Sequence, residues 1–358
     1  MPSLKEIKVR INSISSTLAI TSAMKMVAAA KLQKAQMAIQ NMLPYERRLY
    51  SMLVDLMGAM NISAAASEDG SVRGSGSAER GFDQSGDRLS LSNRHDLAGM
   101  DGAYSLMAQR QVHRVAIVAF ASNSSLCGAF NSNAIREATA VINEYRASGL
   151  RDSDIVVYSV GRKMAEAMRK LGFPSPADFT KMSDSPSYEA ASALAQELLD
   201  GFVSGRFDKV ELVYNHYKST SSQPTTRQTY LPLSLADATA DIQVGKITDS
   251  ASESDTNRGA EPVGAPVVRQ GSPTTEDLIV EPSKEALIAT LLPKVIRLRI
   301  FTTLLDSAAA EHAARTVAMQ LATDNGNDLL QELTLEYNKG RQQKITSEIL
   351  DLVGGSMQ

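Results

Sequence analysis

Two short stretches of this 358-residue sequence place reactive side chains where they could do chemistry. Cys127 lies in the run Ser125–Asn131, where it could be a nucleophile or a small residue buried in a tight turn. The second interpretation is favoured, because free cysteines are among the most buried residues. Gly161, Arg162 and Lys163 follow an apolar run and could bind phosphate. One glycine and two cations favour instead solvated charges at the start of a helix.

The stronger signatures of catalysis are missing from the sequence. It contains no GxGxxG, no GxxxxGK[ST], and no Ser/His/Asp set or carboxylate pair with catalytic spacing. Its four histidines also lack the spacing of metal ligands; they are His95, His113, His216 and His312. We therefore expect no active site, cofactor or metal on this chain.

The last stretch, Tyr337–Gln358, begins polar and ends nearly uncharged. A frayed, solvated terminus is one interpretation, but it would expose four apolar side chains to water. These four are Ile345, Ile349, Leu352 and Val353. The polar candidates for contact are Arg341, Gln342, Thr346 and Glu348. A narrow apolar tip of this composition suits insertion into an opening in another protein.

Both ends of the chain are predicted to be long helices. Residues 4–57 contain no glycine, and their apolar residues form a heptad seam that predicts a partner helix. Three polar residues, Thr21, Lys25 and Glu46, interrupt this seam. The seam consists of Ile7, Ile11, Ile14, Leu18, Ala28, Leu32, Ala35, Ile39, Met42, Leu49, Leu53 and Leu56. Helices over 4–57 and 284–353 would be about 80 and 105 Å long, whereas a domain between them would have a radius of gyration of about 14 Å. The helices must therefore protrude, most economically wound on each other, and their outer parts must meet another protein.

The middle of the chain predicts a mainly parallel sheet covered by helices. Continuous apolar runs at 115–120 and 155–160 are typical of buried strands. A further strand is expected at 210–217 and an edge strand at 227–231. Helices are expected at 133–148, 162–171 and 187–202. Two segments rich in Ser, Gly and Asp are predicted to be flexible insertions. The resulting divisions are a helix over 1–60, an insertion over 61–110, an α/β domain over 111–235, an acidic insertion over 236–277, and a last strand (278–281) and helix within 278–358.

Composition narrows the function further. The net charge of −3 argues against general nucleic-acid binding, although residues 1–57 hold eight Lys/Arg against three Asp/Glu. A single cysteine indicates a reducing compartment. No apolar run of about 18 residues could span a membrane, and the N-terminus enters a helix without a signal peptide, so we do not expect export.

Three segments carry a resemblance to a known family. They are Ile20–Leu32, Leu126–Asn131 and the C-terminal segment, which includes Ala322–Asn325, Ile345–Ile349 and Gly354–Ser356. Together they resemble the gamma subunit of the F-type proton-translocating ATP synthase. The resemblance covers most of the chain except the two insertions.

The resemblance implies a rotor. The terminal helices would form an antiparallel coiled coil inside a hexamer of three alpha and three beta subunits, with a Rossmann-like sheet domain outside it. With the epsilon subunit, that domain would dock on the ring of c subunits, at the cytoplasmic face of the bacterial plasma membrane. ATP, ADP and Mg²⁺ would be bound by the alpha and beta subunits, and the chain would touch the membrane only through the complex.

The resemblance also implies roles for single residues. Met24 and Lys25 match positions near an acidic lever of the beta subunit. The four polar residues Arg341, Gln342, Thr346 and Glu348 match positions that meet a beta-subunit loop. The four apolar residues of the last stretch would form a shaft tip in the alpha/beta bearing.

Two departures from the family qualify these expectations. The family turn Ser-Asp-Arg-Gly is replaced by Ser122–Ser125, which has no charge, and the insertions have no cysteine, which excludes a thiol switch there. Two other functions stay open from the residues alone. One is an α/β enzyme or nucleotide-binding protein with a helical arm; the other is a coiled-coil scaffold on nucleic acid.

Overall fold

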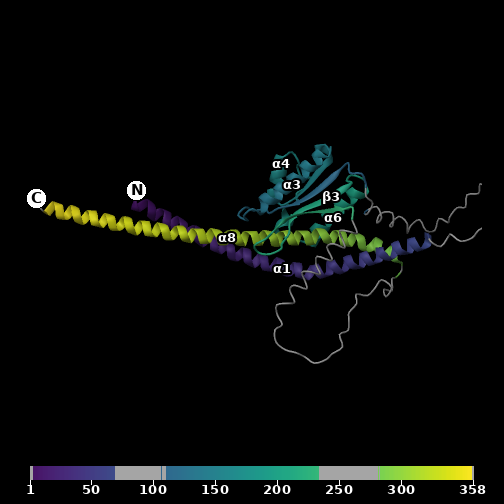
Figure 1. The fold of residues 1–358 in the computed structure, drawn as a ribbon, viewed down its shortest axis with the longest axis horizontal. Helices are drawn as coiled ribbons and strands as arrows, with labels where there is room; N and C mark the ends of the chain where they lie inside the picture. The colour runs from purple at the N-terminus through teal and green to yellow at the C-terminus, as the bar shows by residue number, and fades with distance from the viewer. Residues whose placement is uncertain (1–2, 69–105, 107–109, 234–280, 282, 357–358) are drawn as a thin grey trace, which may run out of the picture.

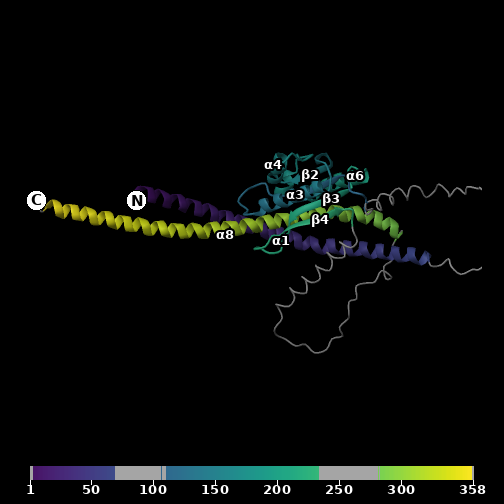
Figure 2. The same cartoon turned by 45° about the horizontal axis from the view of Figure 1, so that its top comes forward.

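The structure is a computed structural model that describes residues 3–68, 106, 110–233, 281 and 283–356. Two long helices, α1 (Leu4–Glu68) and α8 (Lys284–Ser356), lie along each other, and both chain ends point to the same end of the molecule (Figures 1 and 2). The two helices are therefore antiparallel. The sheet domain packs against the opposite part of the helix pair (Figure 1). The predicted α/β fold with a coiled coil of the terminal helices is confirmed.

The heptad seam is confirmed along the whole of its predicted length. All twelve of its residues are buried or partly buried, and Thr21, Lys25 and Glu46 lie on the same partly buried side. On α8 the positions shielded from solvent over 323–340 recur at spacings of three and four: 323, 326, 330, 333, 337 and 340. Matching spacings on both helices are what a coiled coil requires.

Serine caps begin both helices. Ser3 Oγ accepts a hydrogen bond from the Glu6 N–H at 3.3 Å, and Glu6 Oε2 accepts one from the Ser3 N–H at 3.0 Å. Ser283 Oγ accepts a hydrogen bond from the Ala286 N–H at 3.1 Å. The first pair is a capping box, which satisfies two backbone donors at once.

Two predicted boundaries are wrong. The helix α1 continues through Gly58 to Glu68, so residues 61–68 do not belong to an insertion. The run Ala64–Ala66 favours helix strongly enough to outweigh one glycine, which costs about 1 kcal/mol. Leu106, also assigned to that insertion, is buried in the core. Residues 69–105, 236–277 and the predicted strand at 278–280 lie outside the described residues, and Glu281 is in a bend.

One four-stranded sheet has the order β2-β1-β3-β4. Strands β1 (Val115–Phe120), β2 (Ile155–Val160) and β3 (Lys209–Asn215) are parallel, and β4 (Thr225–Leu231) joins β3 antiparallel at the edge. The mainly parallel sheet and the edge strand are confirmed. The helices are α3 (Phe130–Ala147), α4 (Arg162–Lys170), α5 (Thr180–Asp184) and α6 (Tyr188–Val203), with a short 3₁₀ helix at Asp152–Asp154.

The two faces of the sheet have different covers. Val115, Ile117 and Ala119 point to one face, where they pack with α3 and α4. Their neighbours Ala116 and Val118 point to the other face, where they pack with α6 and with the paired ends of α1 and α8. Strand side chains alternate between faces, so burial on both sides explains why these strands are apolar throughout.

A buried carboxylate fastens the edge of the sheet. Glu211 on β3 is 1 % exposed, and its oxygens lie 2.7 Å from Lys209 Nζ, 2.7 Å from Arg227 Nε and 2.6 Å from the Tyr145 hydroxyl. Burial would raise the pKa of Glu211, but hydrogen bonds from Arg227, Lys209 and Tyr145 hold it below its usual value. This cluster ties β3, β4 and α3 together.

Candidate functional site

Among the described residues, no helix pairs with the last part of α8. Leu4 at the start of α1 packs opposite Gly340, and α8 continues for 16 further residues, 341–356, which we name the tip. At 1.5 Å per residue the tip is about 24 Å long. All of residues 341–353 are exposed. The tip is therefore a single helix projecting beyond the coiled coil, as Figure 1 shows for the yellow end of α8.

The apolar residues of the tip do not continue the coiled-coil seam. Extending the spacing of positions 333, 337 and 340 leads to Lys344, Ser347, Asp351 and Gly354, which are polar or glycine. The seam stops opposite Leu4, where α1 begins. The predicted tip residues lie elsewhere on the helix, with exposed fractions of 47 % for Ile345, 54 % for Ile349, 74 % for Leu352 and 53 % for Val353. Their apolar surface is therefore not made for packing on α1.

All eight predicted tip contacts share one side of the helix. At 100° per residue, their positions span about 160° of arc, with the seam outside this arc. They are Arg341, Gln342, Ile345, Thr346, Glu348, Ile349, Leu352 and Val353. Thr346 Oγ1 donates to the Gln342 carbonyl at 2.9 Å, and Glu348 lies 3.8 Å from Lys344 in an exposed pair. Such exposed pairs are weak, so this side can accept a new partner.

Met24 and Lys25 lie on a different part of the rod. Both are partly buried on α1, and Lys25 forms no ion pair with any residue of the described ranges. Position 323 pairs with Thr21 through a hydroxyl contact of 3.1 Å, which places Lys25 near position 319 of α8. The axial distance from there to Arg341 is about 33 Å. The structure therefore does not bring the two predicted contact regions together.

Two glycines of α8 were missed as packing residues. A Cβ at Gly326 would lie 2.7 Å from Leu18 Cδ2, and a Cβ at Gly340 would lie 3.1 Å from Leu4 Cδ2. The glycines are 14 residues apart, as are the leucines. Each leucine therefore occupies the space left by the missing side chain of its glycine, and the two contacts lie two heptads apart. The shared spacing of 14 residues is visible in the sequence, but only the structure shows that the glycines face the leucines.

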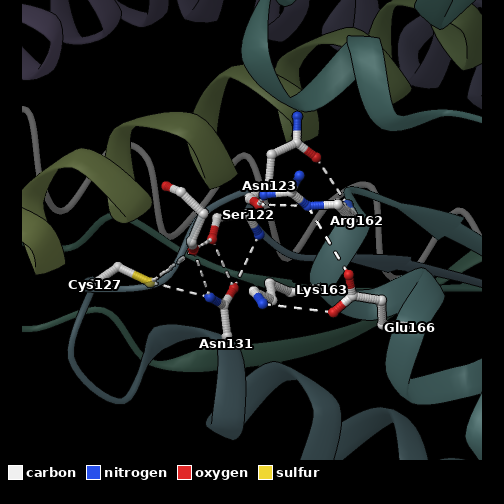
Figure 3. A network of polar contacts seen from close by, with 8 residues as sticks. Ser122, Asn123, Cys127, Asn131, Arg162, Lys163 and Glu166 are labelled. Atoms are coloured by element: carbon white, nitrogen blue, oxygen red, sulfur yellow. Dashed lines mark hydrogen bonds and ion pairs between the residues drawn. The ribbon is translucent and has the colours of Figure 1, made fainter.

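The turn around Cys127 is a closed polar network (Figure 3). Cys127 is buried, and Asn131 Nδ2 donates to its Sγ at 3.1 Å. Asn131 Oδ1 accepts a hydrogen bond from the Ser122 N–H at 3.0 Å. A buried thiol inside such a network supports the interpretation as a packing residue and gives a nucleophile no access to a substrate.

The start of α4 is likewise occupied by the protein itself. The Arg162 N–H donates to Asn123 Oδ1 at 2.8 Å, and the Lys163 N–H donates to the Ser122 carbonyl at 3.1 Å (Figure 3). A phosphate would need these donors. Gly161 is required here, since its φ is 98° and a Cβ would lie 2.0 Å from the Ala121 carbonyl oxygen. The motif thus joins two loops of the sheet domain.

A buried carboxylate, Glu311, lies on α8 beside the ends of β1 and β2, next to the partly buried His312. Burial raises the pKa of Glu311, although Arg315, with Nη1 2.9 Å from Oε1, acts against this. Burial lowers the pKa of His312 to about 4, helped by the charges of Arg315 and Lys31. Arg315 Nη2 also donates to Ser124 Oγ at 2.7 Å, which links α8 to the turn that lacks the family's charges.

The described ranges hold neither a cluster of metal ligands nor a membrane-spanning helix. No group of three or more His, Cys, Asp or Glu there could hold a metal ion. No helix there is long and apolar enough to cross a membrane.

Comparisons with known proteins agree with this architecture. A family model described as ATP synthase matches residues 3–357. The ATP synthase gamma chain of Phocaeicola vulgatus is 46 % identical over 357 residues and that of Bacteroides thetaiotaomicron 44 % over 358, each match covering 100 % of both chains. The rotor of the Euglena gracilis mitochondrial ATP synthase has the same fold, with a TM-score of 0.51 at 18 % identity over 96 % of this chain and 98 % of that one. The chain belongs to the family of ATP synthase gamma chains and is the central-stalk subunit of that complex.

Proposed function

We propose that the chain is the rotating shaft that couples proton-driven turning of the c ring to conformational cycling of the catalytic beta subunits. In this proposal the tip turns inside the alpha/beta hexamer, and the sheet domain lies outside it and docks with the epsilon subunit on the c ring. The complex sits at the cytoplasmic face of the bacterial plasma membrane. ATP, ADP and Mg²⁺ are bound by the alpha and beta subunits.

The single observation that carries this proposal is the side of α8 on which the apolar residues of the tip lie. The seam side of α8 faces α1 as far as Gly340, whereas the four apolar side chains of the tip lie on the opposite side, which already carries the exposed Leu335 in the paired part of the helix. Four exposed apolar side chains on a single helix gain free energy by burial, and within the described ranges nothing covers them. A surrounding sleeve of other subunits would bury them.

Polar residues of the same arc make the surface that the tip presents to the sleeve depend on the angle of the shaft. Arg341 and Glu348 share one edge of the arc, whereas Ile349 and Val353 lie toward the other. A beta subunit that faces the first edge meets charges, and one that faces the second meets only uncharged side chains, since Gln342 and Thr346 lie there with the two apolar residues. Rotation then presents a different surface to each beta subunit in turn.

Substitutions on and off this arc test the proposal in the assembled complex. Ile349→Gln with Leu352→Gln places two amides in the apolar bearing, and burial of each without a partner costs about 1–3 kcal/mol. We expect ATP-driven proton pumping per ATP hydrolysed to fall severalfold in membrane vesicles. Leu171→Gln is the matched control, because Leu171 is 45 % exposed but caps α4 in the sheet domain, outside the tip. Normal pumping by the double variant would contradict the proposal.

The polar residues have their own test. Arg341→Ala with Gln342→Ala should weaken assembly or coupling while the sheet domain stays folded, because both side chains are exposed and far from that domain. A complex of this double variant that hydrolyses ATP and pumps protons normally would remove the two residues from the contact with the beta subunit.

A further inference from the structure

One short segment of the sheet domain reaches both helices of the shaft. Strand β3 is an inner strand of the sheet and ends at Asn215. The next two residues, His216 and Tyr217, leave the sheet toward α8 and α1. Because β3 is bonded to strands on both sides, its end is fixed in the sheet domain.

Asp306 of α8 holds this segment with both of its carboxylate oxygens. His216 Nδ1 lies 2.6 Å from Asp306 Oδ2, and the Tyr217 N–H donates to Asp306 Oδ1 at 2.9 Å. The Asp306 side chain is 16 % exposed, so water competes little for it. Charge-assisted hydrogen bonds of this kind are short and directional, and two of them fix an orientation as well as a distance.

Tyr217 then acts as a wedge between three parts of the molecule. Its ring packs against the cluster of Leu32, Ala309 and Ala313 where α1 meets α8. It also packs against the cluster of Cys127, Phe130 and Ala310, where α8 meets the sheet domain. Its hydroxyl accepts a hydrogen bond from Gln36 Nε2 of α1 at 2.6 Å.

Asn215, two residues before the wedge, is anchored in the sheet domain. Asn215 is buried, and its Nδ2 donates to the Phe130 carbonyl at 3.0 Å. Its Oδ1 accepts a hydrogen bond from Thr225 Oγ1 at 2.7 Å. Within three consecutive residues, the chain is bonded to α3, β4, α8 and α1.

We propose that Asn215–Tyr217, closed on Asp306 and Gln36, is an angular lock that fixes the sheet domain relative to the shaft. Apolar contacts resist separation but have no preferred direction, so the large core between sheet and helices allows small rotations. Directional hydrogen bonds on both helices oppose such rotations. Torque received by the sheet domain then turns the coiled coil without angular slip. This inference rests on the proposed rotor function, because only a rotor carries torque.

The test uses angular fluctuations of the assembled complex. The alpha/beta hexamer is immobilised, and a bead is attached through Lys170→Cys at the exposed end of α4; the native Cys127 is buried. In Asp306→Ala, two charge-assisted bonds are lost, and we expect the angular variance of the bead to rise about twofold. Asp324→Ala is the matched control, since that carboxylate of α8 bonds Gln320 on its own helix, at 2.7 and 2.8 Å.

The outcomes separate the lock from the rotor. Rotation of the unsubstituted complex under ATP tests the proposed function. If that complex rotates and Asp306→Ala has the variance of Asp324→Ala, the lock is refuted while the rotor stands. If Asp306→Ala fails to assemble, Tyr217→Phe removes the hydroxyl bond to Gln36 together with a 3.5 Å contact to Thr220, and the lock predicts a smaller but measurable rise in variance. An unchanged variance in Tyr217→Phe would then refute it. A purely structural role would lower the yield of complex without altering the fluctuations of those that assemble.

Discussion

Replacing Gly326 by alanine should destabilise the coiled coil, whereas the same change at Gly340 should not. Both glycines lie inside α8, so each alanine gains about 1 kcal/mol of helix propensity. The neighbours differ. A Cβ at Gly326 would lie 2.7 Å from Cδ2 and 3.2 Å from Cγ of Leu18, but one at Gly340 would lie 3.1 Å from Cδ2 and 4.0 Å from Cγ of Leu4.

The magnitude follows from these distances. Overpacking costs about 1–3 kcal/mol, and taking about 2 kcal/mol at Gly326 leaves that variant about 1 kcal/mol less stable than the parent. Leu4 is the first residue of α1 and can move, so Gly340→Ala keeps most of its gain. The two variants should differ by about 2 kcal/mol, which is about 30-fold in a local opening equilibrium.

Hydrogen exchange of the full chain measures this opening around residue 18 of α1. Gly326→Ala should exchange faster there than the parent. In a Leu18→Ala background the overlap disappears, and Gly326→Ala should instead slow exchange. Equal exchange in Gly326→Ala and Gly340→Ala around their respective leucines would refute the packing argument, as would destabilisation by Gly326→Ala that persists without Leu18.

Three further predictions concern the sheet domain and its link to α8. The hydrogen bond with Asp306 raises the pKa of His216 above 6.5. The stability that this link contributes is therefore complete below pH 6.5 and is lost as the pH rises through the raised pKa. The melting temperature should fall as the pH rises over this range, and it should fall less in Asp306→Asn. Glu211→Gln removes the buried carboxylate shared by Lys209 and Arg227, whose side chains are 27 % exposed, and should cost about 1–3 kcal/mol in urea unfolding. An unchanged midpoint would contradict the assigned role. Gly161→Ala should unfold the domain, because its Cβ would overlap a backbone carbonyl. Gly172 has a φ of 91° and no neighbour within 4 Å, so Gly172→Ala should cost only the conformational strain. Circular dichroism distinguishes the two variants.

Much of the fold was predictable because its signals are local. The strands at 115–120 and 155–160 are continuous apolar runs, and the structure has them at the same residues. The seam of α1 was equally clear, because spacings of three and four persist from Ile7 to Ile39. The C-terminal end of α1 could not be predicted in the same way, since Gly58 and the serine-bearing segment after it have the local composition of a helix end.

The tip was predictable only in part. Its composition indicated that it enters another protein. That its apolar residues lie on the side of α8 opposite the seam could be recognised only from the position of Leu4, where α1 begins. The contacts of Gly326 with Leu18 depend on the register of two helices that are about 300 residues apart in sequence. The link between His216 and Asp306 depends on how the sheet sits on the shaft. None of these pairings has a local signal.

The most direct test of the account is the solvent protection of residues 341–353 in the assembled complex. Hydrogen exchange of this segment is compared between the isolated chain and the complex, with the exposed end of α4 at Arg169 and Lys170 as the reference. A housed tip predicts slowing of exchange by about tenfold or more on assembly, with little change at α4. The same exchange rate in both states would mean that the tip stays in water, and the shaft assignment would lose its physical basis.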